Sequence, residues 1–434
     1  MGKSKSCSSL ICSLLLILLI ETPAFAQTVC VRLFEIFHPK SIEISAAKSS
    51  VSRPLNRLRI MVNHDSLSQT ETDWMRIDLA ASGLQIKGQD FVRSFRSSDT
   101  LKVATTAGYF IAVLSDNKPQ TKKQFSQRLD EPNSAGGTLS VGFIYPLGAK
   151  NSSSINRSYS GNLKIYARGK ELCIVNLVSL DEYLAGILAA EMPQAESAAL
   201  QAQAVVARTF IIKNWARHAN TGYQFCDLTH CQVYKGSDGV TPKMQQAVIN
   251  TNDEILVYHQ QPIEAYYSST CGGRAADDNG VWANPKDQPY LKSQADSNFC
   301  AHSPHYRWRV KISADSLHQI WQRRLGAPIN AITISKKDAD GRVRELALMD
   351  HSLHLITGED FRAVTCRVLG WNTVKSTAFD LRIEKNIYIF TGRGLGHGLG
   401  LCQYGAMEMA RRGYSYREIL RHYFPETEIQ KYSE

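Results

Sequence analysis

The chain has 434 residues, of which 43% are hydrophobic and 21% charged, and its 50 lysines and arginines exceed its 40 aspartates and glutamates. This length allows one large or two medium domains with hydrophobic cores, and the formal net charge of +10 favours an anionic partner. After the first 26 residues no stretch is long and apolar enough to span a bilayer, which argues against a membrane-spanning protein.

The first 26 residues have the order of a secretory signal peptide. Lys3 and Lys5 precede an apolar run over residues 10–20, and an Ala-Phe-Ala cleavage site follows at residues 24–26. The run is about half of the roughly 20 residues that a spanning helix needs, although an uncleaved anchor is the alternative. We therefore expect an exported protein, in the periplasm or the cell wall, with no membrane span after cleavage. Export also argues against nucleic acid as the anionic partner.

Eight cysteines remain after cleavage, and an even number in an oxidising compartment makes disulfides the default expectation. Their connectivity does not follow from the sequence. The eight are Cys30, Cys173, Cys226, Cys231, Cys271, Cys300, Cys366 and Cys402.

The N-terminal third is expected to be mostly β. Residues 27–53 show no clear periodicity and predict an irregular leader, whereas short apolar runs between residues 57 and 115 predict strands. Residues 115–137 are polar and rich in Pro and Gly, so a loop or linker is expected. The chain is accordingly divided into a signal peptide (1–26), an N-terminal β-rich region with its linker (27–136) and a main domain (137–428).

The main domain is predicted to be of the α+β class, with small antiparallel sheets around a central helix pair. Strands are expected at 138–145, 161–166, 171–178, 254–258, 262–267, 306–312, 329–336 and 387–390, a helix start at 358–362 and a helix through 407–411. The helix pair is expected within residues 180–217, where the second helix, over 198–215, is rich in alanine and can pack closely against neighbours.

A carboxylate ends the apolar face of the first helix of this pair. Leu180, Leu184, Ile187 and Leu188 recur with helical spacing, and the next step of the stripe is Glu191, just before Met-Pro. A carboxyl group at the end of an apolar stripe is poorly solvated, which raises its pKa and keeps a proton on it near neutral pH. Taken alone, a surface charge at a helix end is the plainer interpretation.

Four sequence blocks carry a family resemblance. They are LDEYLAGILAAEMP (180–193) followed by LQAQAVVARTF (200–210), CDLTHCQVYKG (226–236), YYSSTCGGR (266–274), and GRGLGHGLGLCQYGA (392–406). In this order they resemble the stage II sporulation protein D (SpoIID/LytB) family, over residues 137–428.

The resemblance implies a peptidoglycan lytic transglycosylase, which cuts the MurNAc–GlcNAc bond of peptide-stripped strands and leaves 1,6-anhydro ends. The family's essential glutamate corresponds to Glu191. Most glycosidases use two carboxylates, but one is sufficient here because the O6 hydroxyl of the sugar attacks C1. The alternative is a glycan-binding enhancer of cell-wall amidases, which would not need an acid at this position. A zinc-dependent hydrolase is disfavoured because the chain has no His-Glu-x-x-His motif.

Several polar residues of the four blocks are expected to line the sugar groove: Arg208, Gln232, Tyr234, His397 and Gln403. For Arg208 the alternative is a plain salt bridge, and for His397 a glycine-driven turn with the imidazole hydrogen-bonded inside. Tyr266, Tyr267 and Trp282 offer flat faces to sugar rings, although core packing explains them equally well.

The cysteine block has two interpretations. The resemblance implies zinc held by His218, Cys226 and Cys231, with His230 as a competing histidine, and no organic cofactor. A disulfide between the two cysteines is the alternative in an exported protein. Cys271 and Cys300 bracket one loop and are the most plausible disulfide pair.

Overall fold

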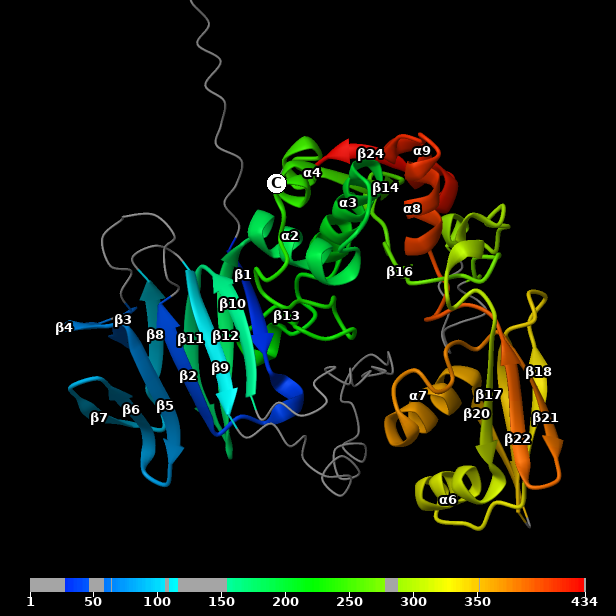
Figure 1. The fold of residues 1–434 in the computed structure, drawn as a ribbon, viewed down its shortest axis with the longest axis horizontal. Coiled ribbons are helices and arrows are strands. Elements are labelled where there is room, and N and C mark those ends of the chain that lie inside the picture. The colour runs from blue at the N-terminus through cyan, green and yellow to red at the C-terminus, as the bar shows by residue number, and fades with distance from the viewer. Residues whose placement is uncertain are drawn as a thin grey trace, which may run out of the picture.

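The computed structural model describes residues 28–46, 58–63, 65–105, 109–115, 154–277, 288–350 and 352–432. Its architecture is α+β, as predicted, with a β-rich part at the N-terminal end, a group of helices in the middle and a smaller α+β lobe beyond them (Figure 1). Among the described residues no helix is long and apolar enough to cross a membrane.

The N-terminal part consists of two mostly antiparallel sheets whose buried faces belong to one hydrophobic core. The first sheet has the order β13 (Phe225–Cys226), β1 (Thr28–Leu33), β12 (Glu171–Ser179), β11 (Asn162–Arg168), β8 (Thr100–Thr105), β3 (Leu58–Val62), β4 (Asp65–Thr72). The second has the order β10 (Ser154–Ser160), β9 (Tyr109–Ser115), β2 (Ser41–Ala46), β5 (Trp74–Ala80), β6 (Gly83–Gly88), β7 (Val92–Arg96).

Residues 27–53 are not an irregular leader where the structure describes them. They contain β1 and β2, and β1 lies between β12 and β13, so the start of the chain completes the sheet that carries the first helix. Val29, Val31 and Leu33 alternate along β1 and are fully buried, but this run of six residues is short, and Arg32, which is 1% exposed, is buried as well. Its guanidinium donates to Glu171 at 3.3 Å, which offsets the cost of burying the charge.

Five helices form the middle of the molecule (Figure 1). They are α2 (Leu180–Glu191), α3 (Ser197–Lys213), α4 (Pro242–Asn250), α8 (Gln403–Arg411) and α9 (Tyr416–Tyr423). α3 contacts all four of the others, and its buried alanines allow this close packing. The predicted pair is therefore confirmed as α2 and α3, whereas α4 and α9 were not predicted.

Short sheets surround these helices. β15 (Gln261–Pro262), β14 (Glu254–Tyr258) and β24 (Glu428–Lys431) form one, and β16 (Tyr267–Ser268) with β23 (Leu401–Cys402) forms a parallel pair. The strand expected over 262–267 is wrong for most of its length, because only its two ends pair with other strands.

The smaller lobe has its own hydrophobic core, built from residues 308–390. It contains β17 (Trp308–Ser313), α6 (Ala314–Leu325), β18 (Ala331–Lys337), β19 (Val343–Met349), β20 (Leu353–Thr357), α7 (Gly358–Leu369), β21 (Phe379–Glu384) and β22 (Ile387–Gly392). The expected helix start at 358 is confirmed, but α6 was not predicted. The expected linker at 116–137, the strand at 138–145 and Trp282 lie outside the described residues.

Candidate functional site

Glu191 is the last residue of α2, and local chemistry explains why the helix ends there. The Ser179 side chain caps the N-terminus by accepting from the Glu182 N–H, and two acidic residues in the first turn suit the positive end of the helix dipole. At the other end the Met192 N–H closes the last turn and Pro193 stops propagation. Leu184, Ile187 and Leu188 are fully buried, so the stripe that predicted the helix also fixes where Glu191 points.

Three hydrogen-bond donors from three separate segments converge on the Glu191 carboxyl group. The backbone N–H of Val233 donates to Oε1 at 3.1 Å, and the Tyr267 hydroxyl donates to the same oxygen at 3.4 Å. The Gln403 amide donates to Oε2 at 3.2 Å. Both carboxyl oxygens are thus held in place, a property expected of a group that must present a proton in one direction.

A second layer of amides holds these donors. The single proton of the Tyr267 hydroxyl is shared between Glu191 and the Gln232 side-chain oxygen, which lies at 3.1 Å, and the Gln232 amide in turn donates to the Ala207 carbonyl of α3. The Gln403 amide donates to the Gln203 side chain of α3 at 3.4 Å. Gln232 and Gln403, which the sequence suggested as groove residues, therefore belong to the network around Glu191. Gln203 and Lys235 were not predicted.

The environment of Glu191 favours its protonated form. Burial raises the pKa of this carboxyl group above its ordinary value, and the three donors and the positive charge of Lys235 counteract only part of that shift. The ammonium group of Lys235 is itself half-buried, and burial lowers its pKa. The positive charge of Lys235 thus lowers the pKa of Glu191 by stabilising its carboxylate.

Replacement of this lysine by a neutral side chain should move the titration of Glu191. In Lys235→Met the pKa of Glu191 is expected to rise further, because the charge that stabilises its anion is gone. Titration of carboxyl-¹³C-glutamate by NMR, with Glu191→Gln to assign the resonance, measures this shift. Lys243→Met is the matched control, since Lys243 lies on α4 and pairs with Glu196. An unchanged or lower pKa in Lys235→Met would contradict the electrostatic account.

Arg208 and Tyr234, which were expected to line a groove, have their described contacts elsewhere than at Glu191. The buried guanidinium of Arg208 donates to the carbonyls of Thr251 at 2.7 Å, Glu254 at 3.1 Å and Val248 at 3.4 Å. It therefore fastens α3 to the turn between α4 and β14. Tyr234 is 1% exposed and its hydroxyl donates to Asn176 at 2.9 Å within the core. Neither side chain is available to a glycan in this structure.

The glycine-rich loop is a junction between two parts of the molecule rather than an open cradle. Gly394, Gly396, Gly398 and Gly400 all have positive φ, which only glycine adopts without strain. The backbone N–H groups of residues 394, 395, 396, 399 and 401 donate within the protein, and a Cβ at Gly400 would lie 2.1 Å from the Tyr266 carbonyl. The loop therefore needs glycine for close packing and does not present these N–H groups to a ligand.

His397 lies inside this loop. Its Nδ1 accepts from the Leu399 N–H at 3.0 Å, and it also hydrogen-bonds to the backbone of Tyr267. Burial, together with Arg362 and Arg342, lowers the pKa of His397 to about 3, so the imidazole is neutral. Its contacts correspond to the plainer interpretation of the sequence, a hydrogen-bonded histidine that supports the segment bearing Tyr267.

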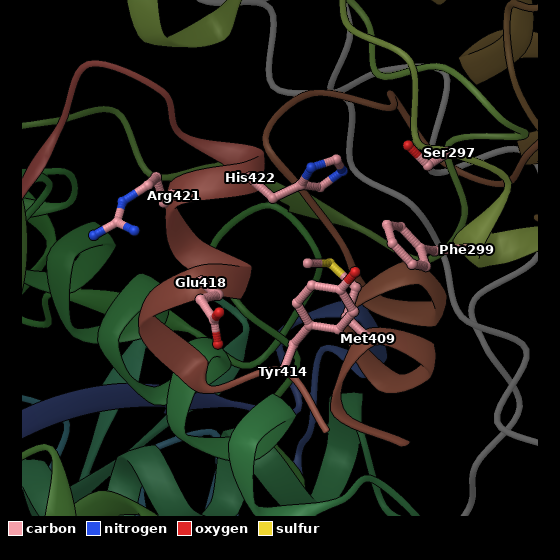
Figure 2. A pocket seen from close by; sticks show the side chains of 7 residues that line it. All are labelled: Ser297, Phe299, Met409, Tyr414, Glu418, Arg421 and His422. Carbon is pink, nitrogen blue, oxygen red and sulfur yellow. The ribbon is translucent and has the colours of Figure 1, made fainter. Parts of the chain in front are cut away.

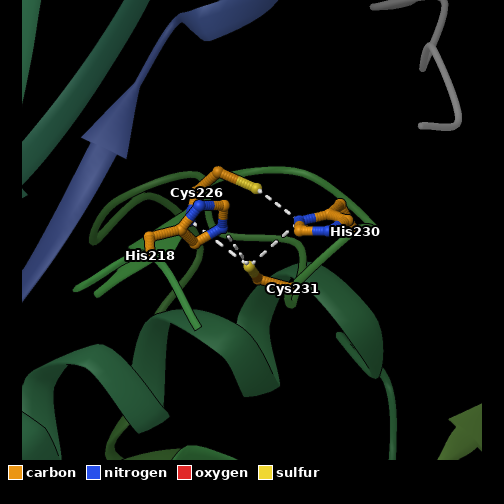
Figure 3. A group of neighbouring side chains, drawn as sticks. All are labelled: His218, Cys226, His230 and Cys231. Carbon is orange, nitrogen blue, oxygen red and sulfur yellow. Dashed lines mark hydrogen bonds between the residues drawn. The ribbon is translucent and has the colours of Figure 1, made fainter. Parts of the chain in front are cut away.

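The first cysteine block forms a compact group of four metal-ligating side chains. His218, Cys226, His230 and Cys231 place one ligand atom each within 4.8 Å of all the others. Figure 3 shows both imidazoles turned toward the sulfur atoms; His218 Nε2 lies 3.3 Å from Cys231 Sγ, and His230 Nδ1 lies 3.7 Å from Cys226 Sγ. The two histidines that competed in the sequence thus both belong to the same group. Two thiols and two imidazoles can hold a tetrahedral metal ion.

Cys271 and Cys300 are not bonded in this structure, although they are close. Their Sγ atoms are 3.5 Å apart, and Cys402 and Asp296 lie in the same buried cluster. The expected disulfide is therefore absent, and its two cysteines belong to a larger set.

A surface hollow of about 340 Å³ lies between α8, α9 and the segment before Cys300 (Figure 2). Its lining residues are Ser297, Phe299, Met409, Tyr414, Glu418, Arg421 and His422. Glu191 is not among them. The candidate active site therefore rests on the convergence of donors on Glu191, not on the presence of this hollow.

Two protein-family models match the chain. "Stage II sporulation protein" matches residues 168–258, which contain α2, α3 and the first cysteine block. A domain of unknown function, DUF8618, matches residues 299–400, which cover the smaller lobe and its hydrophobic core.

Three relatives show how much of the chain is shared. An uncharacterized protein of Brachyspira hyodysenteriae is 30% identical over 63% of this chain and 73% of its own length. Stage II sporulation protein D of Bacillus subtilis is 31% identical over 59% of this chain and 76% of its own length. The amidase enhancer of Bacillus subtilis is 28% identical over 57% of this chain but only 40% of its own length. The chain belongs to the stage II sporulation protein D family.

Proposed function

We propose that this protein is an exported peptidoglycan lytic transglycosylase in which Glu191 is the single acid and base. The observation that carries the proposal is the state of Glu191: burial raises its pKa while three donors from distant segments fix both of its oxygens. A desolvated, oriented carboxyl group with a raised pKa is what protonation of a glycosidic oxygen requires.

The reaction would proceed in two proton transfers through one group. Glu191 donates its proton to the oxygen that links MurNAc to GlcNAc, and the C1–O bond breaks as the leaving hydroxyl forms. The O6 hydroxyl of the same MurNAc attacks C1, forms the 1,6-anhydro ring and gives its proton to the Glu191 carboxylate. The donors from Val233 and Gln403 stabilise that carboxylate between the two transfers. No water is consumed, so a second carboxylate to activate water is not needed.

Similarity to the amidase enhancer favours one alternative, a protein that binds glycan and stimulates cell-wall amidases without cutting the strand. A binding protein has no use for a carboxyl group whose desolvation is unfavourable, so Glu191 supports the enzyme. The basic sequence suits an anionic cell wall in either case.

Incubation with insoluble, peptide-stripped glycan strands separates the two functions. We expect the mature protein to release soluble fragments without any added amidase. Stripped strands that sediment with bound protein but release nothing, together with faster removal of stem peptides from intact peptidoglycan when an amidase is added, would favour the enhancer over the enzyme.

We also propose that the group of His218, Cys226, His230 and Cys231 holds zinc. The thiol and imidazole donors and their mutual distances fit that ion. Bound there, zinc would join the end of α3 to the segment that leads to Val233, whose N–H donates to Glu191. This is a structural role and involves no step of the reaction.

Loss of this group should remove one metal equivalent. Cys226→Ser combined with Cys231→Ser is expected to lose one zinc per chain and to unfold at a lower temperature, because the metal stabilises only the folded state. Elemental analysis and calorimetry measure both. Cys366→Ser, a buried cysteine of the smaller lobe, is the control. Unchanged metal content in the double variant would refute this site.

A further inference from the structure

A second group of metal-ligating side chains lies next to the segments that bear Tyr267 and Gln403. Cys271, Asp296, Cys300 and Cys402 place one ligand atom each within 4.8 Å of all the others. The three cysteines are fully buried and Asp296 is 1% exposed. They come from three segments: the turn after β16, the loop that leads into a 3-10 helix (Phe299–His302) together with that helix, and β23.

The geometry suits a single ion better than disulfide bonds. The Sγ atoms of Cys271 and Cys300 are 3.5 Å apart, far from the roughly 2.05 Å of a disulfide. Sulfur atoms bound tetrahedrally at about 2.3 Å from zinc are separated by roughly 3.8 Å. An odd number of thiols also cannot be used up by pairing inside the cluster, because one disulfide would leave the third thiol buried beside Asp296.

The surroundings are prepared for ligands with fixed positions. The Cys300 N–H donates to Asp296 Oδ2 at 2.9 Å, and the Tyr423 hydroxyl donates to Oδ1 at 2.5 Å. The Cys271 N–H donates to the sulfur of Cys402 at 3.2 Å. Such hydrogen bonds orient carboxylate and thiolate ligands around a metal.

Charge also favours a cation at this position. Cysteines bind such an ion as thiolates, and the ion would compensate the charge of three thiolates and a carboxylate in this buried position. Once a divalent ion is bound, the site keeps an excess of negative charge, and the buried guanidinium of Arg342 donates to the Cys271 carbonyl at 3.4 Å beside it.

The cluster is connected to two of the donors to Glu191 through the strands β16 and β23. Ser268 pairs with Cys402 and Tyr267 with Leu401 in the parallel β16–β23 ladder. Tyr267 donates to Glu191 from one strand, and Gln403, the residue after Cys402, donates from the end of the other. An ion bound to Cys271 and Cys402 would therefore fasten these two segments to each other.

We propose that Cys271, Asp296, Cys300 and Cys402 form a structural site for zinc or a similar thiophilic divalent ion, which positions Tyr267 and Gln403 against Glu191. The ion itself follows from the cluster alone, whereas its effect on catalysis rests on the proposed function. The hollow of Figure 2 is lined by Ser297, Phe299 and His422. These residues are the sequence neighbours of Asp296, Cys300 and Tyr423, so we infer that an ion would reach the cluster from the hollow.

The test uses the Cys226→Ser, Cys231→Ser double variant, in which the first group cannot bind metal. We expect the full-length variant to retain one metal equivalent by elemental analysis and, after chelation and reloading with Co²⁺, to show a thiolate-to-cobalt charge-transfer band in the near ultraviolet. Addition of Cys300→Ser should abolish both signals, and addition of Cys366→Ser should leave both unchanged. Should the Cys300 variant not fold, Asp296→Asn is expected to weaken Co²⁺ binding at least about tenfold.

A metal-free double variant in which peptide mapping finds a Cys271–Cys300 disulfide would overturn the proposal. The positioning role is measured separately, by glycan cleavage of the double variant before and after Co²⁺ or Zn²⁺ is restored. We expect cleavage to fall on chelation and to recover on reloading; unchanged cleavage would overturn the positioning role. A wild-type protein that binds metal but cuts no glycan under any condition would contradict the proposed enzyme and leave the metal site standing.

Discussion

Glu191→Gln is expected to reduce glycan cleavage by about 10³-fold or more, because the amide can neither give nor take the proton that the reaction needs. The amide oxygen can still accept from Val233 and Tyr267, so the fold around the site should persist. Glu196→Gln is the matched control, since that carboxylate lies five residues further on at the exposed start of α3. Release of soluble fragments from peptide-stripped strands measures both variants. Equal activity of Glu191→Gln and wild type would remove Glu191 from the mechanism.

The same substitution should change stability in a pH-dependent way. The pKa of Glu191 is raised in the folded protein, so the wild-type fold is favoured at low pH and loses stability as pH rises from the unfolded-state pKa through the folded-state pKa. The neutral amide of the variant carries no such penalty. The unfolding temperature of Glu191→Gln relative to wild type is therefore expected to increase from pH 4 to pH 8. A difference that shrinks over this range would mean that the carboxylate is stabilised, not destabilised, by its surroundings.

Arg208→Ala is expected to destabilise the protein by about 3–5 kcal/mol, one of the largest effects available to a single substitution. The change removes the guanidinium donor from the carbonyls of Thr251, Glu254 and Val248, of which the last still accepts from Thr251. Since the free energy of unfolding of a domain is about 5–15 kcal/mol, part of the variant should be unfolded at 37 °C. Urea denaturation measures the loss.

The control for Arg208 is Lys213→Ala, an exposed lysine in the last turn of the same helix. We expect it to change stability by less than about 0.5 kcal/mol. The folded fraction of Arg208→Ala should cleave glycan at the wild-type rate, because its guanidinium does not contact Glu191. A stable Arg208→Ala protein that no longer binds glycan would restore the role in substrate binding that the sequence suggested.

Local periodicity predicted the element that carries Glu191. The stripe from Leu180 to Leu188 is a property of neighbouring residues, and the structure has the same helix with the same end. β1 was missed although Val29, Val31 and Leu33 alternate, because a run of six residues is short and the two strands that it pairs with, β12 and β13, are distant in the chain. Pairing with distant strands leaves no local signal in the sequence.

The environment of Glu191 could not be predicted from spacing. Its donors lie 42, 76 and 212 residues from it in the chain, and one of them is a backbone N–H that carries no sequence signal. Gln403 was proposed from family resemblance, but its contact with Glu191 depends on how α8 packs against α3. For the same reason the sequence suggested only two members of the second cysteine cluster. Cys271 and Cys300 share a loop, whereas Cys402 follows Cys271 by 131 residues.

The most direct test of the central claim is the mass of the fragments that the mature protein releases from peptide-stripped glycan strands. Attack by O6 consumes no water, so we predict fragments with 1,6-anhydro-MurNAc ends, each lighter by one water than a hydrolysis product, and none from Glu191→Gln. Fragments with ordinary reducing ends would show that water is the nucleophile and would contradict the mechanism in which Glu191 acts alone.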